Sequence, residues 1–269
     1  MSYEETPESA IGEAAGEPPA PEPPRNALTD SGLGRIVGVL VSPTATFRSI
    51  ARRPTWIAPL VALLLVAMVG GFVAVDKIDK GEVRDLLEAQ MEAQGNNPTD
   101  EELDRFVDLQ LKIGAGCNIV LLGIGLPLIA LVMMVVFRML GGEITFGRSF
   151  STVIHAMMPL VVSGVIGIVI LLLRSEPLGV REVQFGGVLA SNLAGFAPEG
   201  ASDVVLTILG SLDVFSFWVV ALLAIGFATV AGVSTGSAAM AAGALWIVWI
   251  VVKVGLAVVG QAFSGGGGG

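Results

Sequence analysis

The sequence predicts an all-α integral membrane protein, a polytopic helical bundle with five transmembrane helices. Two observations carry this prediction. Of the 269 residues, 53% are hydrophobic and only 14% are charged, against about 25% charged residues in a soluble domain. A bilayer core about 30 Å thick is crossed by roughly 20 apolar residues, and five runs come near this length: 56–75, 113–137, 152–173, 213–233 and 239–260. Because lipid offers no partner to an unpaired backbone group, these runs must be helical, and residues 56–263 form one membrane domain.

The two ends of the chain do not belong to this domain. Residues 1–29 are acidic and proline-rich, so they bury little and we expect a disordered tail. A secretory signal would need a basic start and an apolar core in this stretch, and neither is visible. Residues 264–269 are almost entirely glycine and are expected to form a flexible tail.

Residues 30–55 are expected to form two short amphipathic helices, separated at Ser42-Pro43. They carry a basic cluster that no acidic residue opposes between Ser31 and Thr55: Arg35, Arg48, Arg52 and Arg53. A basic amphipathic stretch beside a membrane helix is typical of a segment in the headgroup layer of an anionic leaflet. The alternative is a helix that packs under the bundle.

Residues 76–112, between the first two spans, are expected to form an acidic helical hairpin outside the bilayer. This segment holds eleven acidic and five basic residues. Thr99 and Glu102 have the spacing of a capping box, which predicts that the second helix of the hairpin begins there. Such a hairpin is either a solvated structure packed on itself or a docking surface for a partner.

The remaining spans contain features that interrupt a helix. Pro127 lies inside the second span and Pro159 in the first third of the third span, and both are expected to kink their helices because proline cannot donate its backbone hydrogen bond. The apolar stretch 204–233 is longer than one crossing needs. We therefore expect its helix to begin outside the bilayer or to break near Gly210.

The distribution of lysine and arginine indicates the orientation only weakly, since seven lie on each predicted side. The arginines that precede the first span are dense and unopposed, however, and the first span usually dominates orientation. We therefore predict that the N-terminus is cytoplasmic and the C-terminus lies outside.

The candidate functional or structural polar residues of the predicted spans are Asn118, His155, Asp213 and Lys253. Three of them, His155, Asp213 and Lys253, are ionisable, and because ionisable groups are costly in a bilayer, each of these three is a functional hypothesis by default. Asp213 and Lys253 fall in the outer halves of neighbouring spans, which predicts an ion pair. His155 is the only histidine and is interpreted as structural or as a proton-active group.

The sequence contains no pattern expected of an enzyme. One histidine and one cysteine are too few for a zinc site, and the glycine-rich stretches lie within or between apolar helices, so they are not phosphate loops. The formal net charge of −9 argues against nucleic acid. We expect no catalytic, cofactor-binding or metal-binding residues.

Three motifs, taken in order, resemble the Yip domain family of Rab-interacting-protein-like five-span membrane proteins, in a bacterial form. They are 42–50 (SPTATFRSI) with Pro54 and Pro59, then Gly141-Gly142 and 145–150 (TFGRSF) leading to His155 and Pro159, and finally 232–239 (GVSTGSAA). The resemblance covers about residues 33–260 and implies the five-span fold in a bacterial cytoplasmic membrane. Eukaryotic relatives are membrane proteins of the secretory pathway that interact with small GTPases and with one another, and they contain an Asp-Leu-Tyr-Gly-Pro stretch. That stretch is absent here, where Tyr3 is the only tyrosine, so GTPase binding is in doubt.

Two functions follow as hypotheses. The first is a non-enzymatic scaffold or adaptor that acts in the bilayer through a membrane-protein partner or through homo-oligomers. The second is a small transporter or channel, which requires that the polar residues of the spans converge on one cavity.

Overall fold

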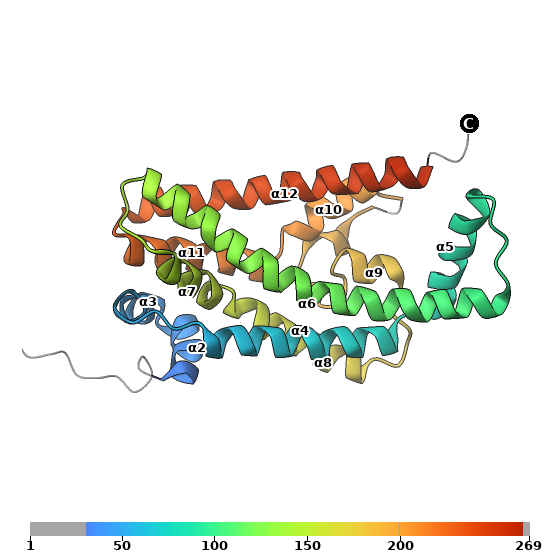
Figure 1. The fold of residues 1–269 in the computed structure, drawn as a ribbon, viewed down its shortest axis with the longest axis horizontal. Helices are drawn as coiled ribbons and strands as arrows, with labels where there is room; N and C mark the ends of the chain where they lie inside the picture. Colours follow the sequence, from blue (N-terminus) through green and yellow to red (C-terminus); the bar gives the residue numbers. More distant parts are fainter. Residues whose placement is uncertain (1–30, 199, 266–269) are drawn as a thin grey trace, which may run out of the picture.

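The computed structural model describes residues 31–198 and 200–265, so the predicted tail 1–29 and most of the tail 264–269 lie outside the described residues. Five helical segments are long and apolar enough to cross a membrane, which confirms the predicted fold class. Figure 1 shows them side by side along the long axis of the molecule. They are α4 (Ile57–Lys77), α6 (Asp100–Met139), α7 with α8 (Phe146–Leu173), α11 (Val214–Ala231) and α12 (Thr235–Gly265).

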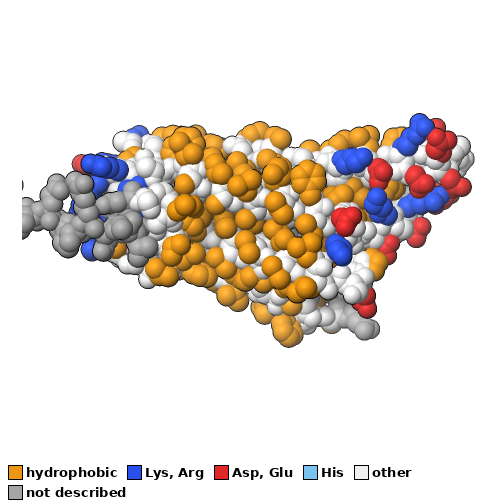
Figure 2. Space-filling model, turned by 90° about the horizontal axis from the view of Figure 1, so that it is seen from below, with side chains coloured by type: hydrophobic (Ala, Val, Ile, Leu, Met, Phe, Trp, Pro, Cys, Tyr) orange, Lys and Arg blue, Asp and Glu red, His pale blue; other side chains and the backbone are white. Residues whose placement is uncertain are grey.

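The two ends of the bundle differ in charge. We call one end, formed by α2, α3, the α6–α7 loop and the α11–α12 turn, the arginine end. The opposite, acidic end holds α5 (Lys80–Ala93), the first turns of α6, and the segment from α9 (Val180–Gln184) to α10 (Asp203–Ser211). Figure 2 shows an apolar belt between a few arginines at one end and mixed, mostly acidic charges at the other. This pattern is that of a protein whose middle lies in hydrocarbon and whose two ends lie in water.

Two short helices, α2 (Gly32–Val41) and α3 (Pro43–Arg52), close the arginine end. Phe47 and Ile50 of α3 are fully buried and pack against the bundle core. In contrast, α2 leaves Leu33 and Val37 exposed, and turns Arg35 inward. The segment thus packs under the bundle through α3 while α2 retains an exposed apolar stripe.

The third span is broken rather than continuous. Helix α7 (Phe146–Ala156) ends at Met157 and α8 (Met158–Leu173) begins immediately after it. Pro159 lies in the first turn of α8, where its missing N–H leaves the carbonyl of His155 without the usual donor four residues later. Helix α6, by comparison, runs without interruption through Pro127.

The fourth apolar run is also divided. Helix α10 (Asp203–Ser211) ends near the predicted position, and α11 begins after Asp213. The carboxylate of Asp213 accepts hydrogen bonds from the backbone N–H groups of Phe215 at 2.8 Å and Ser216 at 3.1 Å. This N-cap satisfies donors that would otherwise be unpaired at the start of a membrane helix.

The core is concentrated near the arginine end, around α7 and α11. Phe137 of α6 and Phe227 of α11 stack with ring centroids 4.4 Å apart. Gly226 of α11 lies so close to α3 and α7 that an added Cβ would be 2.7 Å from Cγ2 of Thr152 and 2.9 Å from the ring of Phe47. Seven of the eleven residues of α7 are buried, whereas α12 lies on the outside of the bundle, with most of its apolar side chains exposed.

The α5–α6 hairpin extends the acidic end beyond the spans. Helix α5 (Lys80–Ala93) packs against the first turns of α6 through Val83, Leu103 and Val107, all buried. The predicted capping box is confirmed, because both reciprocal bonds between Thr99 and Glu102 are present. Ion pairs cross the hairpin from Lys80 to Asp108 and from Arg84 to Asp100 and Asp104.

Candidate functional site: a buried polar network and an apolar groove

The polar side chains of α7 form a network at the arginine end. Ser149 Oγ donates to the carbonyl of Ala130 at 2.6 Å, and Ser151 Oγ donates to the carbonyl of Thr55 at 2.6 Å. The two serines are fully buried. Because they are two residues apart on the helix, they face different neighbours, and they tie α7 to α6 and to the start of α4. Buried hydroxyls are stabilising only when they are paired, and these are.

Arg35 belongs to the same network, because α2 turns it into the protein. Its guanidinium is 3% exposed. It donates to the carbonyl of Arg53 at 2.8 Å, to Oγ1 of Thr55 at 2.5 Å and to Oγ of Ser49 at 2.8 Å. The prediction that Arg35 belongs to the membrane-surface basic cluster is therefore wrong. The three other arginines of that cluster are exposed: Arg48, Arg52 and Arg53.

His155 ends the network. Its Nδ1 lies 2.8 Å from the carbonyl of Ser151. A carbonyl only accepts hydrogen bonds, so Nδ1 carries the proton and the Nε2 atom of the neutral ring is an acceptor. This Nε2 is buried and has no hydrogen-bond partner among the described residues. An unpaired buried acceptor costs about 1–3 kcal/mol, so His155 is the point of the network where a donor would bind.

The described residues of the network supply hydrogen-bond donors and acceptors that can bind and position another group. General acid–base or nucleophilic chemistry needs a histidine paired with a carboxylate or a nucleophile. Among the described residues no carboxylate bonds to His155, and its one bond goes to a backbone carbonyl. No group of three metal-ligating side chains is found in the described part of the chain.

The predicted ion pair between Asp213 and Lys253 is not formed, and this prediction is wrong. Asp213 is engaged in capping α11 and accepts a hydrogen bond from Ser191 Oγ. Lys253 lies half-buried on α12 and makes no ion pair with a described residue. The helix N-terminus takes the carboxylate because its free N–H groups are nearer and carry partial positive charge.

His155 lies apart from the other three polar residues of the spans along the bundle axis. Asn118 is exposed on α6. At 1.5 Å per residue, its position and that of Lys253 fall roughly 30 Å from the arginine ends of α6 and α12, whereas His155 lies only nine residues into the third span. No described hydrogen bond joins any two of Asn118, His155, Asp213 and Lys253.

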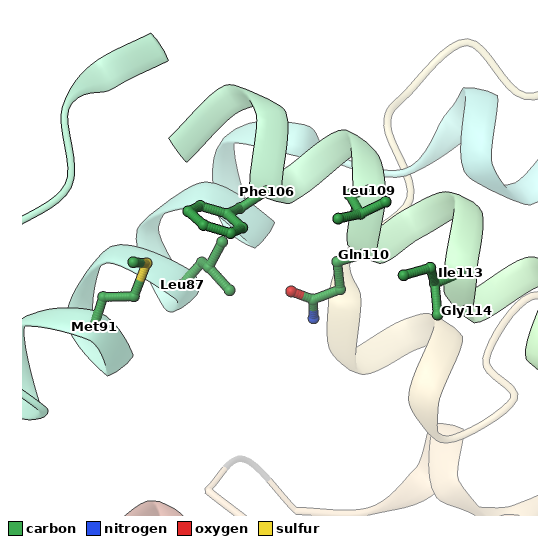
Figure 3. A pocket seen from close by; sticks show the side chains of 7 residues that line it. All are labelled: Leu87, Met91, Phe106, Leu109, Gln110, Ile113 and Gly114. Atoms are coloured by element: carbon green, nitrogen blue, oxygen red, sulfur yellow. The ribbon is translucent and has the colours of Figure 1, made fainter. Parts of the chain in front are cut away.

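A second candidate is an apolar groove at the acidic end, between α5 and α6. It has a volume of about 410 Å³ and is almost entirely apolar. Figure 3 shows Leu87 and Met91 of α5 and Phe106 of α6 around the same hollow, with Leu109 and Ile113 farther along α6. Phe106 and Leu109 are about half exposed, at 46% and 53%.

The electrostatics of the hairpin favour its folded, charged form. The pKa of Glu102 is lowered chiefly by the backbone N–H of Thr99. The pKa of Asp108 is lowered by the hydrogen bond from Lys80. Lowered carboxyl pKa values mean that the ionised hairpin is the stable one.

Sequence reasoning missed the burial of Arg35 and the two serines of α7. One signal for Arg35 was present. Gly34 and Gly38 lie on the same side of α2 as Arg35, and small residues allow a helix to approach its neighbour closely. An added Cβ on Gly32 would lie 2.9 Å from Cβ of Ala58, which shows how near α2 lies to α4. For the serines no sequence signal distinguishes a buried hydroxyl from one that faces lipid.

These features define the class of the protein: a multi-pass, α-helical integral membrane protein with five spans, whose first two short helices pack under the bundle. Residues 37–256 match the Yip1 domain, which is most of the chain. The chain belongs to the Yip1 domain family. No curated protein and no solved structure matches it significantly.

Proposed function

We propose that this protein is a non-enzymatic scaffold or adaptor of a bacterial cytoplasmic membrane, and that it acts by association with a membrane-protein partner. The apolar groove of the α5–α6 hairpin carries the proposal. The groove lies at the acidic end of the bundle, where the Phe106 and Leu109 side chains are about half exposed. Contiguous apolar surface of this kind is characteristic of a binding site.

The charges around the groove specify the chemistry of the partner. Lys80, Arg84 and Arg105 are paired with acidic residues of the hairpin itself. None of the four acidic residues of α5 forms an ion pair with a described residue: Glu82, which accepts a hydrogen bond from the backbone N–H of Val180, and Asp85, Glu88 and Glu92. A complementary partner is therefore an amphipathic helix with an apolar face and basic flanks, bound at the membrane surface.

Transport is less well supported than scaffolding. It needs polar groups gathered around one pathway, and no described hydrogen bond or ion pair joins any two of Asn118, His155, Asp213 and Lys253. Neither the apolar groove nor the hollow at the α6–α7 loop is lined by any of them.

We further propose that the arginine end faces the cytoplasm. Arg48, Arg52 and Arg53 support this, because they form no ion pair with described residues, and unopposed basic residues beside the first span are characteristic of its cytoplasmic side. A reporter fused after Gly269 tests it. Activity characteristic of the external compartment supports the orientation, and cytoplasmic activity contradicts it.

The scaffold proposal is tested with two matched leucines of the hairpin. Leu109 lines the groove and is 53% exposed, whereas Leu86 does not line it and is 55% exposed. A photo-crosslinking residue is placed at each of the two positions, and the protein is crosslinked in native membranes. The crosslinked partner is identified, and its complex with this protein is then reconstituted from purified components.

We expect a defined adduct from position 109 and none from 86. Leu109→Asn should weaken reconstituted binding about tenfold, the equivalent of about 1.4 kcal/mol, and added salt should weaken it further, while Leu86→Asn changes it less than about threefold. A second copy of the chain as the adduct would identify self-association. Equal adducts, or equal effects of the two substitutions, would contradict the proposal.

A further inference from the structure

We propose that the loop between α6 and α7 is a binding site for a phosphate-bearing anion, held by Arg138 and Arg148. The two arginines and residues 141–145 line a surface hollow of about 550 Å³ at the arginine end. This site lies at the opposite end of the molecule from the hairpin groove, and it does not depend on the scaffold proposal.

The loop is held rigidly, so the hollow is formed in advance. Gly141 has φ +83°, a left-handed conformation that favours glycine. The N–H of Gly142 donates to the carbonyl of Phe137 at 2.9 Å, and a Cβ at this position would lie 3.0 Å from Ala231. The N–H of Glu143 then donates to the carbonyl of Ala231 at 3.1 Å. The loop is thus fixed to the ends of both α6 and α11.

The same loop positions the guanidinium group of Arg138, and Arg148 follows it in the first turn of α7. Nε of Arg138 donates to the carbonyl of Ile144 at 2.9 Å, while its Nη groups form no hydrogen bond to a described residue. Arg148 lies half-buried in the first turn of α7 and forms no ion pair with a described residue. Glu143 also lines the hollow but pairs with neither arginine. Two forked donors on one hollow match the geometry of a phosphate group.

The surrounding charge strengthens the attraction. Besides Arg138 and Arg148, the exposed arginines of α3 and the α3–α4 link lie at this end, and Glu143 is the one acidic residue among the described residues of the α6–α7 loop. The hollow lies where α6 ends and the third span begins, which is the depth of the lipid headgroups. A phosphate there has two sources, the headgroup of an anionic phospholipid or soluble phosphate.

The test measures lipid binding to the purified full-length protein in detergent by native mass spectrometry. Phosphatidylglycerol is titrated against phosphatidylcholine, and the protein is also titrated with inorganic phosphate alone. Variants Arg138→Gln and Arg148→Gln remove the two donors. Arg52→Gln is the matched control, an exposed arginine at the same end that does not line the hollow. Monodispersity and the thermal midpoint are recorded for each variant, to show that it is folded.

We expect wild type to bind one phosphatidylglycerol more tightly than phosphatidylcholine, and Arg148→Gln to lose about tenfold or more in affinity. Arg52→Gln should change it less than about threefold. Glu143→Gln should bind more tightly than wild type, because it removes a repelling carboxylate from the hollow. This gain is a result that general loosening of the loop would not produce.

The two titrations distinguish the source of the anion. If millimolar phosphate does not displace bound phosphatidylglycerol, the ligand of the hollow is a lipid headgroup. Displacement by phosphate, with the same loss in Arg148→Gln, identifies a site for the soluble anion. The proposal is overturned if both arginine variants, shown to be folded, bind these ligands as Arg52→Gln does, or if Glu143→Gln weakens binding.

Discussion

The close contact at Gly226 leads to a quantitative prediction about the stability of the core. Glycine at this position lets α11 approach α3 and α7. In Gly226→Ala the new Cβ would lie 2.7 Å from Cγ2 of Thr152 and 2.9 Å from the ring of Phe47. Ordinary carbon contacts are about 3.5–4.0 Å, so at least two neighbours must move by more than half an ångström. Overpacking of a close-packed core costs about 1–3 kcal/mol, and we expect Gly226→Ala to be destabilised by that amount.

The shape of the site also predicts a partial rescue. Thr152→Ser removes the clashing Cγ2 atom but keeps the hydroxyl, which donates to the carbonyl of Arg148 at 2.8 Å. The double variant should recover about half of the loss, since the contact with Phe47 remains. Gly243→Ala on α12 is the control, because its Cβ would meet nothing within 4 Å. It should be neutral, or more stable by up to about 1 kcal/mol.

The assay is reversible unfolding in mixed micelles, followed by the fluorescence of the tryptophans, with each free energy of unfolding compared to wild type. Equal stability of Gly226→Ala and Gly243→Ala would refute the packing argument. So would a double variant whose loss is the simple sum of the two single losses, because the argument requires that the two positions be coupled.

Three other outcomes are expected. Asp213→Ala should lose about 0.5–2 kcal/mol of stability, because the N-cap of α11 is removed. A double-mutant cycle with Lys253→Met should give no coupling energy. A coupling energy above about 0.5 kcal/mol would show that Asp213 and Lys253 interact after all. Ser149→Ala should cost about 0.5–1.5 kcal/mol in the same unfolding assay, because the hydrogen bond that ties α7 to the Ala130 carbonyl of α6 is lost; a neutral result would show that this bond contributes no net stability. The hairpin should lose protection from hydrogen exchange on acidification. The folded pKa values of Glu102 and Asp108 lie below their ordinary values of 4.5 and 3.8. The stabilisation that these two carboxylates give is thus complete above about pH 4.5 and is lost as the pH falls through their pKa values in the folded protein. The double variant Glu102→Gln, Asp108→Asn should make hairpin protection less dependent on pH. If its protection changed with pH as in wild type, other groups would be responsible for the dependence.

Local chemistry allowed several elements to be predicted from the sequence. The capping box at Thr99 depends on residues three positions apart, so it could be identified without knowledge of the fold. The interruption near Gly210 followed from a run too long for one crossing. These features depend on the segment itself or on the thickness of the bilayer, and both are known before the chain is folded.

The polar contacts could not be predicted in this way. Asp213 and Lys253 were matched by their depth in the bilayer, but depth does not say which way a side chain points around its helix. The N-terminus of α11 offered the carboxylate nearer partners. Arg35 resembled its neighbours Arg48 and Arg52 in type and in setting, and only the rotation of α2 placed it in the interior.

The sequence by itself determined that this protein is a five-span membrane protein, because the free energy of placing apolar residues in hydrocarbon depends on composition and length. It also determined the family, through motifs spread from the first short helix to the last span. Tertiary structure alone decided which arginines are buried, that His155 ends a network, and that the α6–α7 loop forms a hollow lined by Arg138 and Arg148. Those outcomes depend on helix rotation and on contacts between residues far apart in the chain, where differences of one or two kcal/mol decide the arrangement.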